Sequence, residues 1–389
     1  MCTGTQLACR TVHQIYLEGS DTKPKLDTAR AGLMDLARGL GAGAKLPKFL
    51  DLRKQIGISA ETLDDALADL EARNVIYRRH GVGIFVADGL ARKTIALMCD
   101  PKYFTAAEVS PFWHILIEQV RASVAKEDHR LLFQFTTEPV AGGEEDGIAL
   151  QTEAIEAVKI GRIHGVLGVG LSEPVERWLE GRGVPVVGFA VPGEYRVGFD
   201  APVLVSAGVR QLVREGARRI GLWLSFAFHL GARDTGEPES YMVPRFREVL
   251  DVYGLTYYPE LVREARYLPP MVDGQRAETF WEQGYQTASL ICAEPIGVRP
   301  DAIICNSELM VQGALIGMER CGIRIGKDVK VVGHANVGSR VLLPWAGDII
   351  RVANDPAELA RAMLLRLEMR MRGESPEPKH LQLMPKVIL

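Results

Sequence analysis

The sequence predicts an α/β protein with an N-terminal winged helix-turn-helix followed by a two-lobed α/β body. Three observations lead to this prediction. The N-terminal part has the order of a winged helix, with three helical patterns followed by a hairpin. From residue 94 onward, short apolar runs alternate with amphipathic helices, which is typical of parallel sheets covered by helices. This alternation occurs twice in succession, so it indicates two similar lobes.

Length and composition agree with a soluble protein of two or three domains. The 389 residues are 47% hydrophobic and 24% charged, with a formal net charge of −3, which gives no sign of a bulk polyelectrolyte partner. The six cysteines are scattered without metal-ligand spacing, so reduced, mostly buried thiols and no metal are expected. The N-terminus lacks a signal pattern, and no apolar run approaches ~18 residues, so a cytoplasmic protein without a membrane partner is expected.

The N-terminal elements follow from periodicity and from the glycines that punctuate it. Gly41 and Gly57 each follow a helical pattern, and a turn containing Gly81 separates two short apolar strands. The winged helix-turn-helix is therefore expected over 25–88. The expected elements in order are an irregular segment (1–24), helices over 26–40, 48–56 and 59–74, strands over 75–79 and 84–86, and a linker (89–93).

The third helix begins with "SAETLDDALADLEAR" (59–73) and has one apolar face. Its apolar residues recur with the spacing of a buried helical stripe, and Ser59 is a good N-cap. The opposite face carries three carboxylates, which is unexpected for a helix that enters the groove of a polyanion. The apolar positions are Leu63, Ala66, Leu67 and Leu70, and the opposite face has Glu61, Asp64, Asp65 and Ala68.

The body divides into two sets of strand and helix patterns. We expect it to span 94–372, followed by a C-terminal tail over 373–389. The apolar runs of the first set are 95–99, 130–135, 165–170 and 184–190, and those of the second set are 219–225, 301–306 and 329–336.

Two segments resemble known families of bacterial transcription regulators. Residues 46–88, "LPKFLDLRKQIGISAETLDDALADLEARNVIYRRHGVGIFVAD", resemble the winged helix of the GntR family in order and spacing. Residues 94–372 resemble the effector domain of the LacI family, which is similar to periplasmic sugar-binding proteins of type I. This second resemblance is carried by "SPFW" (110–113), "GARRIGLWL" (216–224), "PDAIICNSELMVQGAL" (300–315) and "DVKVVGHAN" (328–336).

A GntR-type head on a LacI-type body is the arrangement of arabinose-repressor-like regulators. The resemblance implies a homodimer that binds double-stranded operator DNA and senses a small molecule, either sugar-related or less polar. Closure of the two lobes around this effector would change the spacing of the two heads in the dimer. The affinity for the effector and the affinity for DNA would thereby be coupled. The resemblance implies neither enzymatic activity nor a cofactor.

The head departs from the GntR pattern at positions that usually hold arginine. Ala60, Asp64 and Asp65 occupy them in the third helix, and Leu50 occupies one in the preceding helix. Arginine at such positions contacts guanine or neutralises phosphate, so recognition is expected to use other parts of the head. The alternative is that the remaining cations form only a solvated rim. The residues expected at DNA are Lys48, Arg53, Lys54, Ser59, Glu61, Thr62, Asp64, Arg78, Arg79, His80 and Gly81.

The body departs from the LacI pattern at positions where that family has charged side chains that bind sugar hydroxyls. Ser307 and Ala335–Asn336 replace pocket aspartates, and Met242 replaces a pocket arginine. Because these charged anchors are missing, we expect a neutral, partly apolar ligand. Phe112 and Trp113 match a ring-stacking pair, although both could simply fill the lobe core. The expected ligand-binding residues are Ser110, Phe112, Trp113, Asn306, Ser307 and Asn336.

Other functions find less support in the residues. The sequence contains no HExxH, GxSxG or GxxxxGK[ST] motif, and no carboxylate is spaced to a nucleophile, which disfavours an enzyme. A solute-binding transport component is disfavoured by the missing export signal. The main alternative is a ligand-binding or protein-interaction module of the same ancestry that has lost specific DNA binding.

Overall fold

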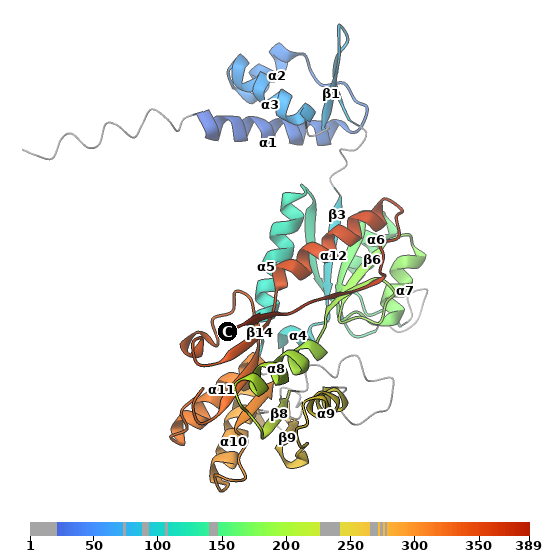
Figure 1. Cartoon of the computed structure of the whole chain (residues 1–389). Helices are drawn as coiled ribbons and strands as arrows, with labels where there is room; N and C mark the ends of the chain where they lie inside the picture. The colour runs from blue at the N-terminus through green and yellow to red at the C-terminus, as the bar shows by residue number, and fades with distance from the viewer. Residues whose placement is uncertain are drawn as a thin grey trace, which may run out of the picture. The chain divides into compact units, whose positions relative to one another are not determined.

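The structure is a computed structural model that places two compact units. The chain divides after Lys93 into an N-terminal head and a C-terminal body, and each is described by itself (Figure 1). Among the described residues, no helix is long and apolar enough to cross a membrane. The described residues are 22–72, 75–87, 93–105, 108–139, 147–225, 242–264, 271–272, 275–276 and 278–389.

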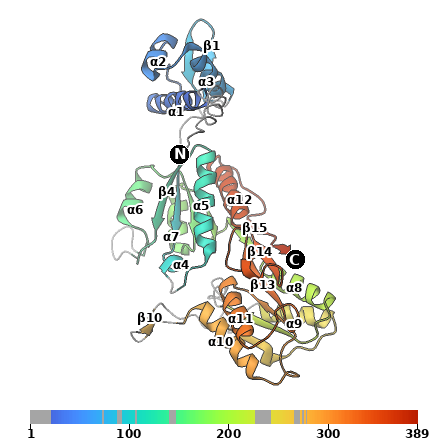
Figure 2. The same ribbon diagram turned by 90° about the vertical axis from the view of Figure 1, so that its left-hand side faces the viewer.

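The head is a winged helix-turn-helix, as the sequence predicts. Helices α1 (Thr22–Leu40), α2 (Phe49–Ile56) and α3 (Ala60–Ala72) precede the antiparallel strands β1 (Ile76–Arg79) and β2 (Gly83–Val86) (Figure 2). Gly57 ends α2 with a φ of 74°, a left-handed conformation that glycine adopts without strain. The predicted linker falls almost entirely outside the described residues.

The N-terminal lobe of the body is a six-stranded parallel sheet between two helical layers. Alternate strand residues point to opposite faces, so the sheet has a separate core on each side. Helices α5 (Pro111–Lys126) and α12 (Pro356–Met371) cover one face, and α6 (Thr152–Lys159) and α7 (Glu173–Gly181) cover the other (Figure 1). A short helix, α4 (Lys102–Thr105), follows the first strand. The strand order is β15 (His380–Leu383), β7 (Arg196–Phe199), β6 (Val186–Phe189), β5 (Gly165–Val169), β3 (Thr94–Cys99) and β4 (Arg130–Phe135).

The C-terminal lobe repeats this architecture. Helices α8 (Pro202–Arg214) and α9 (Met242–Val252) cover one face of its sheet, and α10 (Phe280–Ala293) and α11 (Glu308–Arg320) cover the other. All strand pairs are parallel except that of the last strand, which is antiparallel. The strand order is β16 (Lys386–Ile388), β14 (Ile350–Asn354), β13 (Lys330–Asn336), β12 (Ala302–Cys305), β8 (Ile220–Leu224) and β9 (Val262–Glu264). Shorter elements are the hairpin β10 (Met271–Val272) and β11 (Gln275–Arg276) and the 3₁₀ turns Pro259–Leu261 and Leu343–Trp345.

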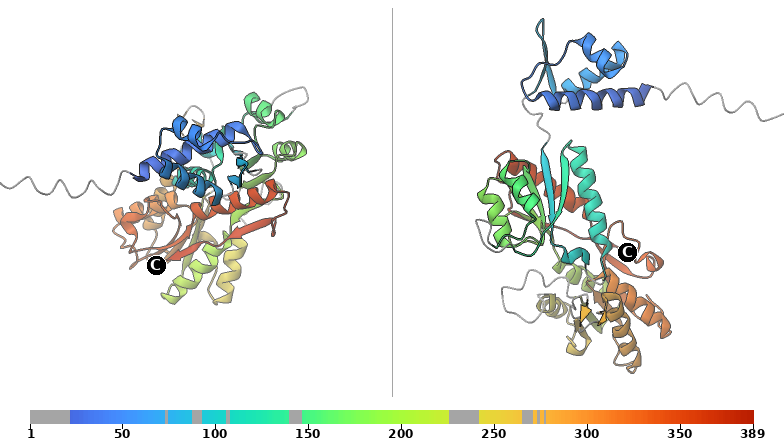
Figure 3. Two further views of the ribbon diagram at one scale, coloured as in Figure 1. Left: turned by 90° about the horizontal axis from the view of Figure 1, so that it is seen from above. Right: turned by 180° about the vertical axis from the view of Figure 1, so that it is seen from behind.

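The C-terminal segment corrects one expectation from the sequence. Residues 373–389, which we expected to form a tail, contain β15 and β16, and these strands extend the N-terminal and C-terminal sheets respectively. The preceding α12 also packs in the N-terminal lobe, among cyan and green elements (Figure 3). The chain therefore passes between the lobes three times, after β7, after β14 and after β15.

A carboxylate buried in the N-terminal lobe gives a pH-dependent prediction. The Glu176 side chain is buried in α7, and burial, together with the nearby Glu180, raises its pKa from 4.5 to about 7. The folded state holds this proton more tightly than the unfolded state does. The contribution of Glu176 to the stability of the fold is therefore fully present below pH 4.5 and is lost as pH rises through about 7. Glu176→Gln should therefore stabilise the protein at pH 8 by on the order of 1–3 kcal/mol, with a smaller difference at pH 5.

Urea unfolding at the two pH values measures this difference. Glu173→Gln is the matched control, because Glu173 lies in the first turn of the same helix but is exposed. An equal gain for Glu176→Gln at pH 5 and pH 8 would contradict the assigned cause.

Candidate nucleic-acid interface and effector site

The third helix of the head folds as its periodicity predicts. Its four predicted apolar positions are all at most 1% exposed and form the core of the head with residues of α1 and of the hairpin. The Ser59 hydroxyl accepts a hydrogen bond from the Thr62 backbone N–H at 3.1 Å, and the two hydroxyls are 2.7 Å apart. Ser59 is thus the N-cap of α3, and its hydroxyl stabilises the start of this helix.

The carboxylates of α3 bind the wing of the same domain. Arg78 in β1 lies 3.2 Å from Asp64 through Nη1 and 3.1 Å from Glu71 through Nε. The Arg78 backbone N–H also donates to Glu71 at 3.1 Å. Arg78 is two residues from the buried Ile76, so both side chains lie on the strand face that packs against α3. Asp64 and Glu71 therefore hold the wing against α3 through Arg78, and this guanidinium partly neutralises their negative charge.

A third carboxylate of α3 is paired in the same way. Asp69 lies 3.1 Å from Nε of Arg30 in α1. Glu61 and Asp65 are exposed, and within the described residues neither has an ion pair. The negative charge that this helix presents to solvent is therefore smaller than its sequence suggests, and it comes mainly from these two side chains.

The predicted phosphate-contacting cations form two groups on the head. Lys48 is the N-cap of the short helix α2, and Arg53 and Lys54 lie in its last turn. All three are exposed and, among the described residues, make no ion pair. On the wing, the Arg79 guanidinium lies 5.4 Å from the ring centres of both Tyr77 and Phe85. This aromatic support restricts the Arg79 side chain while leaving it exposed.

The wing turn contains the remaining predicted DNA contacts. His80 is exposed, and Gly81 has a φ of 72°, which glycine adopts without strain. A turn without a side chain at this position allows the backbone to come close to another molecule.

The predicted effector residues of the C-terminal lobe lie at the carboxyl ends of adjacent strands. Asn306 follows β12 and Asn336 ends β13, and both are at least 96% buried. The Asn306 Oδ1 accepts from the Ser225 backbone N–H at 2.6 Å, and its amide also contacts the sulfur of Met242 at 3.9 Å. Asn306 therefore joins β12 to the end of β8, and these contacts use both the oxygen and the nitrogen of its side-chain amide.

A carboxylate that was not predicted from the sequence lies between Asn336 and Ser110. Glu308 is only 2% exposed, and its Oε1 accepts from Asn336 Nδ2 at 2.7 Å and from the Ser110 hydroxyl at 3.5 Å. Burial raises the pKa of Glu308 above its ordinary value, and the hydrogen bonds from Asn336 and Ser110 oppose this rise only in part. The site therefore contains a buried acid, although the expected aspartates are absent.

The six predicted ligand residues have different environments. Ser110 is the N-cap of α5, and Ser307 is the N-cap of α11, where its hydroxyl accepts from Met310 N–H at 3.5 Å. Phe112 is 7% exposed, and Trp113 packs against Tyr103 with ring centres 4.5 Å apart. Both aromatic residues belong to or flank the N-terminal lobe core, where Phe189 contacts each of them. Their predicted contact with a ligand ring remains a prediction.

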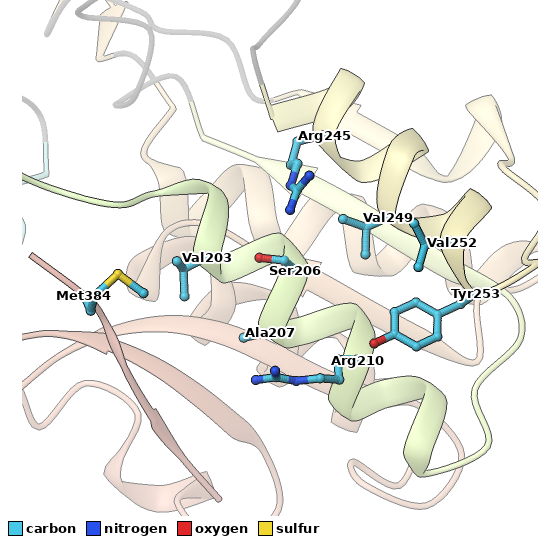
Figure 4. A pocket seen from close by; sticks show the side chains of 9 residues that line it. All are labelled: Val203, Ser206, Ala207, Arg210, Arg245, Val249, Val252, Tyr253 and Met384. Carbon is cyan, nitrogen blue, oxygen red and sulfur yellow. The ribbon is translucent and has the colours of Figure 1, made fainter. Parts of the chain in front are cut away.

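Two cavities lie away from these residues. One cavity of about 350 Å³ lies between exposed parts of α8 and α9, with Tyr253 at one end and Met384 at the other (Figure 4). Another of about 420 Å³ lies at the amino-terminal ends of β3 and β4 and includes Arg130 and His164. Neither cavity is lined by any of the six predicted ligand residues. No group of three or more His, Cys, Asp or Glu side chains in the described part of the chain is arranged to hold a metal ion.

The signal for Glu308 was present in the sequence, one position after the expected aspartate. "CNSELM" places Ser307 where the LacI pattern has aspartate and puts the carboxylate on the following residue, which is the first of α11. Asn354 was missed as well, although it pairs with Asn336 at the ends of the adjacent strands β14 and β13. The repeated strand-terminal asparagines of the C-terminal lobe could have identified it.

The fold and these polar groups define a winged helix joined to a two-lobed body of the periplasmic-binding-protein type. Residues 34–86 match the family model of bacterial regulatory proteins of the gntR family, and residues 209–389 match that of the periplasmic binding protein-like domain. The predicted GntR-type head and periplasmic-binding-protein-like body are therefore confirmed.

Known proteins similar to this chain are transcription regulators by name. The HTH-type transcriptional repressor PurR of Escherichia coli O139:H28 is 31% identical over 108 residues, which are 28% of this chain and 30% of that protein. The chain thus aligns with less than a third of this relative's length.

Solved structures show the same fold at low identity. A regulatory protein of the LacI family from Chloroflexus aggregans has a TM-score of 0.57 at 17% identity, covering 76% of this chain and 96% of that one. The transcriptional regulator CelR, in its complex with cellobiose, has a TM-score of 0.53 at 20% identity, covering 94% of this chain and 98% of that one. These likenesses confirm the predicted LacI-type fold.

Proposed function

We propose that this protein is a ligand-responsive transcription regulator that binds operator DNA as a homodimer in the cytoplasm. The observation that carries the proposal is the joining of a gntR-family winged helix to a periplasmic-binding-protein-like body in one chain. The first kind of domain suits binding to the major groove, and the second suits closure around a small molecule. The repressor name of PurR and the cellobiose complex of CelR support the same assignment.

DNA recognition in this proposal uses two groups of cations that flank α3. Lys48, Arg53 and Lys54 contact phosphate beside α2, and Arg79 with His80 and Gly81 contacts the backbone or minor groove at the wing. Arg78 acts as a positioning residue, because Asp64 and Glu71 already hold its guanidinium. Ser59, Glu61 and Thr62 lie near the start of α3, where base edges come within reach.

The domain boundaries and the effector site are part of the same proposal. The head spans 25–88, the linker 89–93, and the body runs from 94 through β16, with an effector bound near Asn306, Ser307 and Asn336. Two heads are needed because helix-turn-helix proteins read paired half-sites as dimers. Sedimentation at tens of micromolar should give a dimer, and a monomer there would count against this proposal. We propose no enzymatic activity.

One alternative function is favoured by a specific observation. Residues 1–92 contain 13 Lys and Arg and 11 Asp and Glu, a net charge of +2, and Glu61 and Asp65 remain exposed on α3. Many DNA-binding domains are more basic than this. A ligand-binding or protein-interaction module that has lost DNA recognition would have such a head.

Selection of random duplexes on the purified full-length protein distinguishes the two functions. A regulator should enrich sequences with paired half-sites separated by about one helical turn, ~10 base pairs, or a multiple of it. Candidate ligands should then change the affinity of the selected duplex. Failure to enrich any sequence, with or without ligands, would favour the module that has lost DNA recognition.

The acidic helix provides a more specific prediction within this proposal. Asp65→Arg should raise the affinity for duplex DNA by roughly tenfold at low salt, because it removes a repulsive charge and adds a cation without breaking a contact. Asp64→Arg makes the same charge change but removes the partner of Arg78 and places a like charge beside it. Its gain should be clearly smaller than that of Asp65→Arg, as measured by fluorescence anisotropy. Equal gains would mean that the Asp64–Arg78 contact does not position the wing.

A further inference from the structure

We propose that Glu308 anchors an effector bearing an amine, amidine or guanidine group. This inference rests on the proposed function, because it specifies the chemistry of the ligand that the body senses. It differs from the neutral, partly apolar ligand that the sequence suggests, since that expectation depended on the absence of a charged anchor.

Two buried acceptor atoms at this site have no hydrogen-bond partner among the described residues. They are Oε2 of Glu308 and Oδ1 of Asn336, on side chains that are 98% and 96% buried respectively. The Asn336 amide nitrogen donates to the other oxygen of Glu308 at 2.7 Å, so the two unsatisfied oxygens belong to one hydrogen-bonded pair. A buried acceptor without a donor is destabilising, so the pair favours a ligand that offers several N–H donors.

The charge of the site favours a cation over a neutral polyol. Glu308 is the first residue of the 13-residue helix α11, whose N-terminus stabilises a carboxylate. Asn336 and Ser110 donate hydrogen bonds to its other oxygen and favour the ionised form, but burial outweighs them and raises the pKa of Glu308. A bound cation would offset this cost of burial. Sugar hydroxyls could donate hydrogen bonds but would leave the buried negative charge without a counter-ion. An amidinium or ammonium group supplies both donors and charge.

The site also lies where the two lobes meet. Ser110 caps α5 of the N-terminal lobe, and its hydroxyl donates to Glu308 of the C-terminal lobe at 3.5 Å, the upper limit for a hydrogen bond. Nearby, the Trp281 backbone N–H donates to Glu108 at 3.1 Å across the same boundary. A stronger donor from a ligand can replace the long Ser110 contact, so occupation of the site would affect how the lobes close.

Benzene derivatives that share one ring but differ in charge test the proposal on the full-length protein. The probes are benzamidine and benzylamine as cations, benzamide as their neutral counterpart, benzoate as the anion, and cellobiose as a neutral sugar. Isothermal titration at pH 7.5 measures binding to the native protein, to Glu308→Gln and to Glu176→Gln. Glu176 is the matched control, because its carboxylate is also buried with an unpartnered Oε2 but lies in the other lobe. Thermal unfolding verifies that both variants fold.

We expect at least one cationic probe to bind the native protein, and benzamide and benzoate to bind at least tenfold more weakly. Glu308→Gln should lose at least tenfold in affinity for this cation, whereas Glu176→Gln should stay within twofold of native. The proposal is overturned if no cation binds up to 10 mM, if benzamide or cellobiose binds as well as the cations, or if Glu308→Gln retains native affinity. Duplex binding by the native protein is measured separately. If the native protein binds the cation but not DNA, the proposed regulator function is refuted and the proposed effector chemistry is not.

Discussion

Replacing Lys48, Arg53, Lys54 and Arg79 together by alanine is expected to lower the affinity for duplex DNA by about 100-fold or more at low salt. Each cation that contacts a phosphate releases counterions, so the slope of log K against log salt should also become shallower, by roughly 3–4 for each head that contacts the duplex. These four side chains are exposed, and none of them pairs with a carboxylate among the described residues, so their removal should leave the fold of the head intact. Fluorescence anisotropy between 50 and 200 mM salt measures both quantities.

A matched quadruple variant in the body controls for the change in net charge. Lys126, Arg177, Arg214 and Lys327 are exposed cations of the two lobes, and their replacement by alanine changes the total charge by the same amount. This variant should bind DNA within a few-fold of the native protein. A comparable loss of affinity in both variants would mean that binding follows overall charge, and the assigned head surface would be wrong.

Gly313→Ala is expected to destabilise the C-terminal lobe strongly, by about 3 kcal/mol or more. Helices α10 and α11 pack closely through Gly284, Gly313 and Gly317. A Cβ on Gly313 would lie 1.9 Å from the backbone oxygen of Trp281. Since the clashing atom belongs to the backbone, no side-chain rotation can relieve it, and the two helices must separate. Urea denaturation should show a large fall in the free energy of unfolding.

The same substitution at an open position provides the control. Gly297 lies in a turn after α10, has no atom within 4 Å of its would-be Cβ, and does not have a positive φ. Gly297→Ala should change the free energy of unfolding by less than about 0.5 kcal/mol. A loss below 1 kcal/mol for Gly313→Ala would mean that the close packing of α10 and α11 is not required.

Patterns within single elements made much of the fold predictable. The buried stripe of α3 follows from 3.6-residue periodicity. Seven strands of the two lobes follow from short apolar runs, namely β3, β4, β5, β6, β8, β12 and β13, whereas β7, β9 and β14 were not predicted. The assignment of the last residues was wrong because β15 and β16 are short and partly polar. They are strands only because two existing sheet edges pair with them.

The contacts that define the candidate sites could not be predicted in this way. Arg78 and Asp64 are 14 residues apart, and their pairing depends on how the hairpin packs against α3. Glu308 and Ser110 are 198 residues apart and come from different lobes, so no local pattern connects them. Ser110, Asn306 and Asn336 were predicted from the resemblance to the LacI family, whereas the hydrogen bonds that Glu308 accepts from Ser110 and Asn336 depend on the tertiary fold.

Titration of a mixed-sequence duplex against the native protein at different salt concentrations tests the central proposal most directly. If the head binds DNA through exposed cations around α2 and the wing, binding should be measurable at ~50 mM salt. Affinity should then fall by at least roughly 100-fold on raising the salt to ~200 mM, as expected for about four phosphate contacts from one head, and more steeply when both heads of a dimer bind. Absence of duplex binding at ~50 mM salt, where such contacts are strongest, would contradict the assignment of this protein as a DNA-binding regulator.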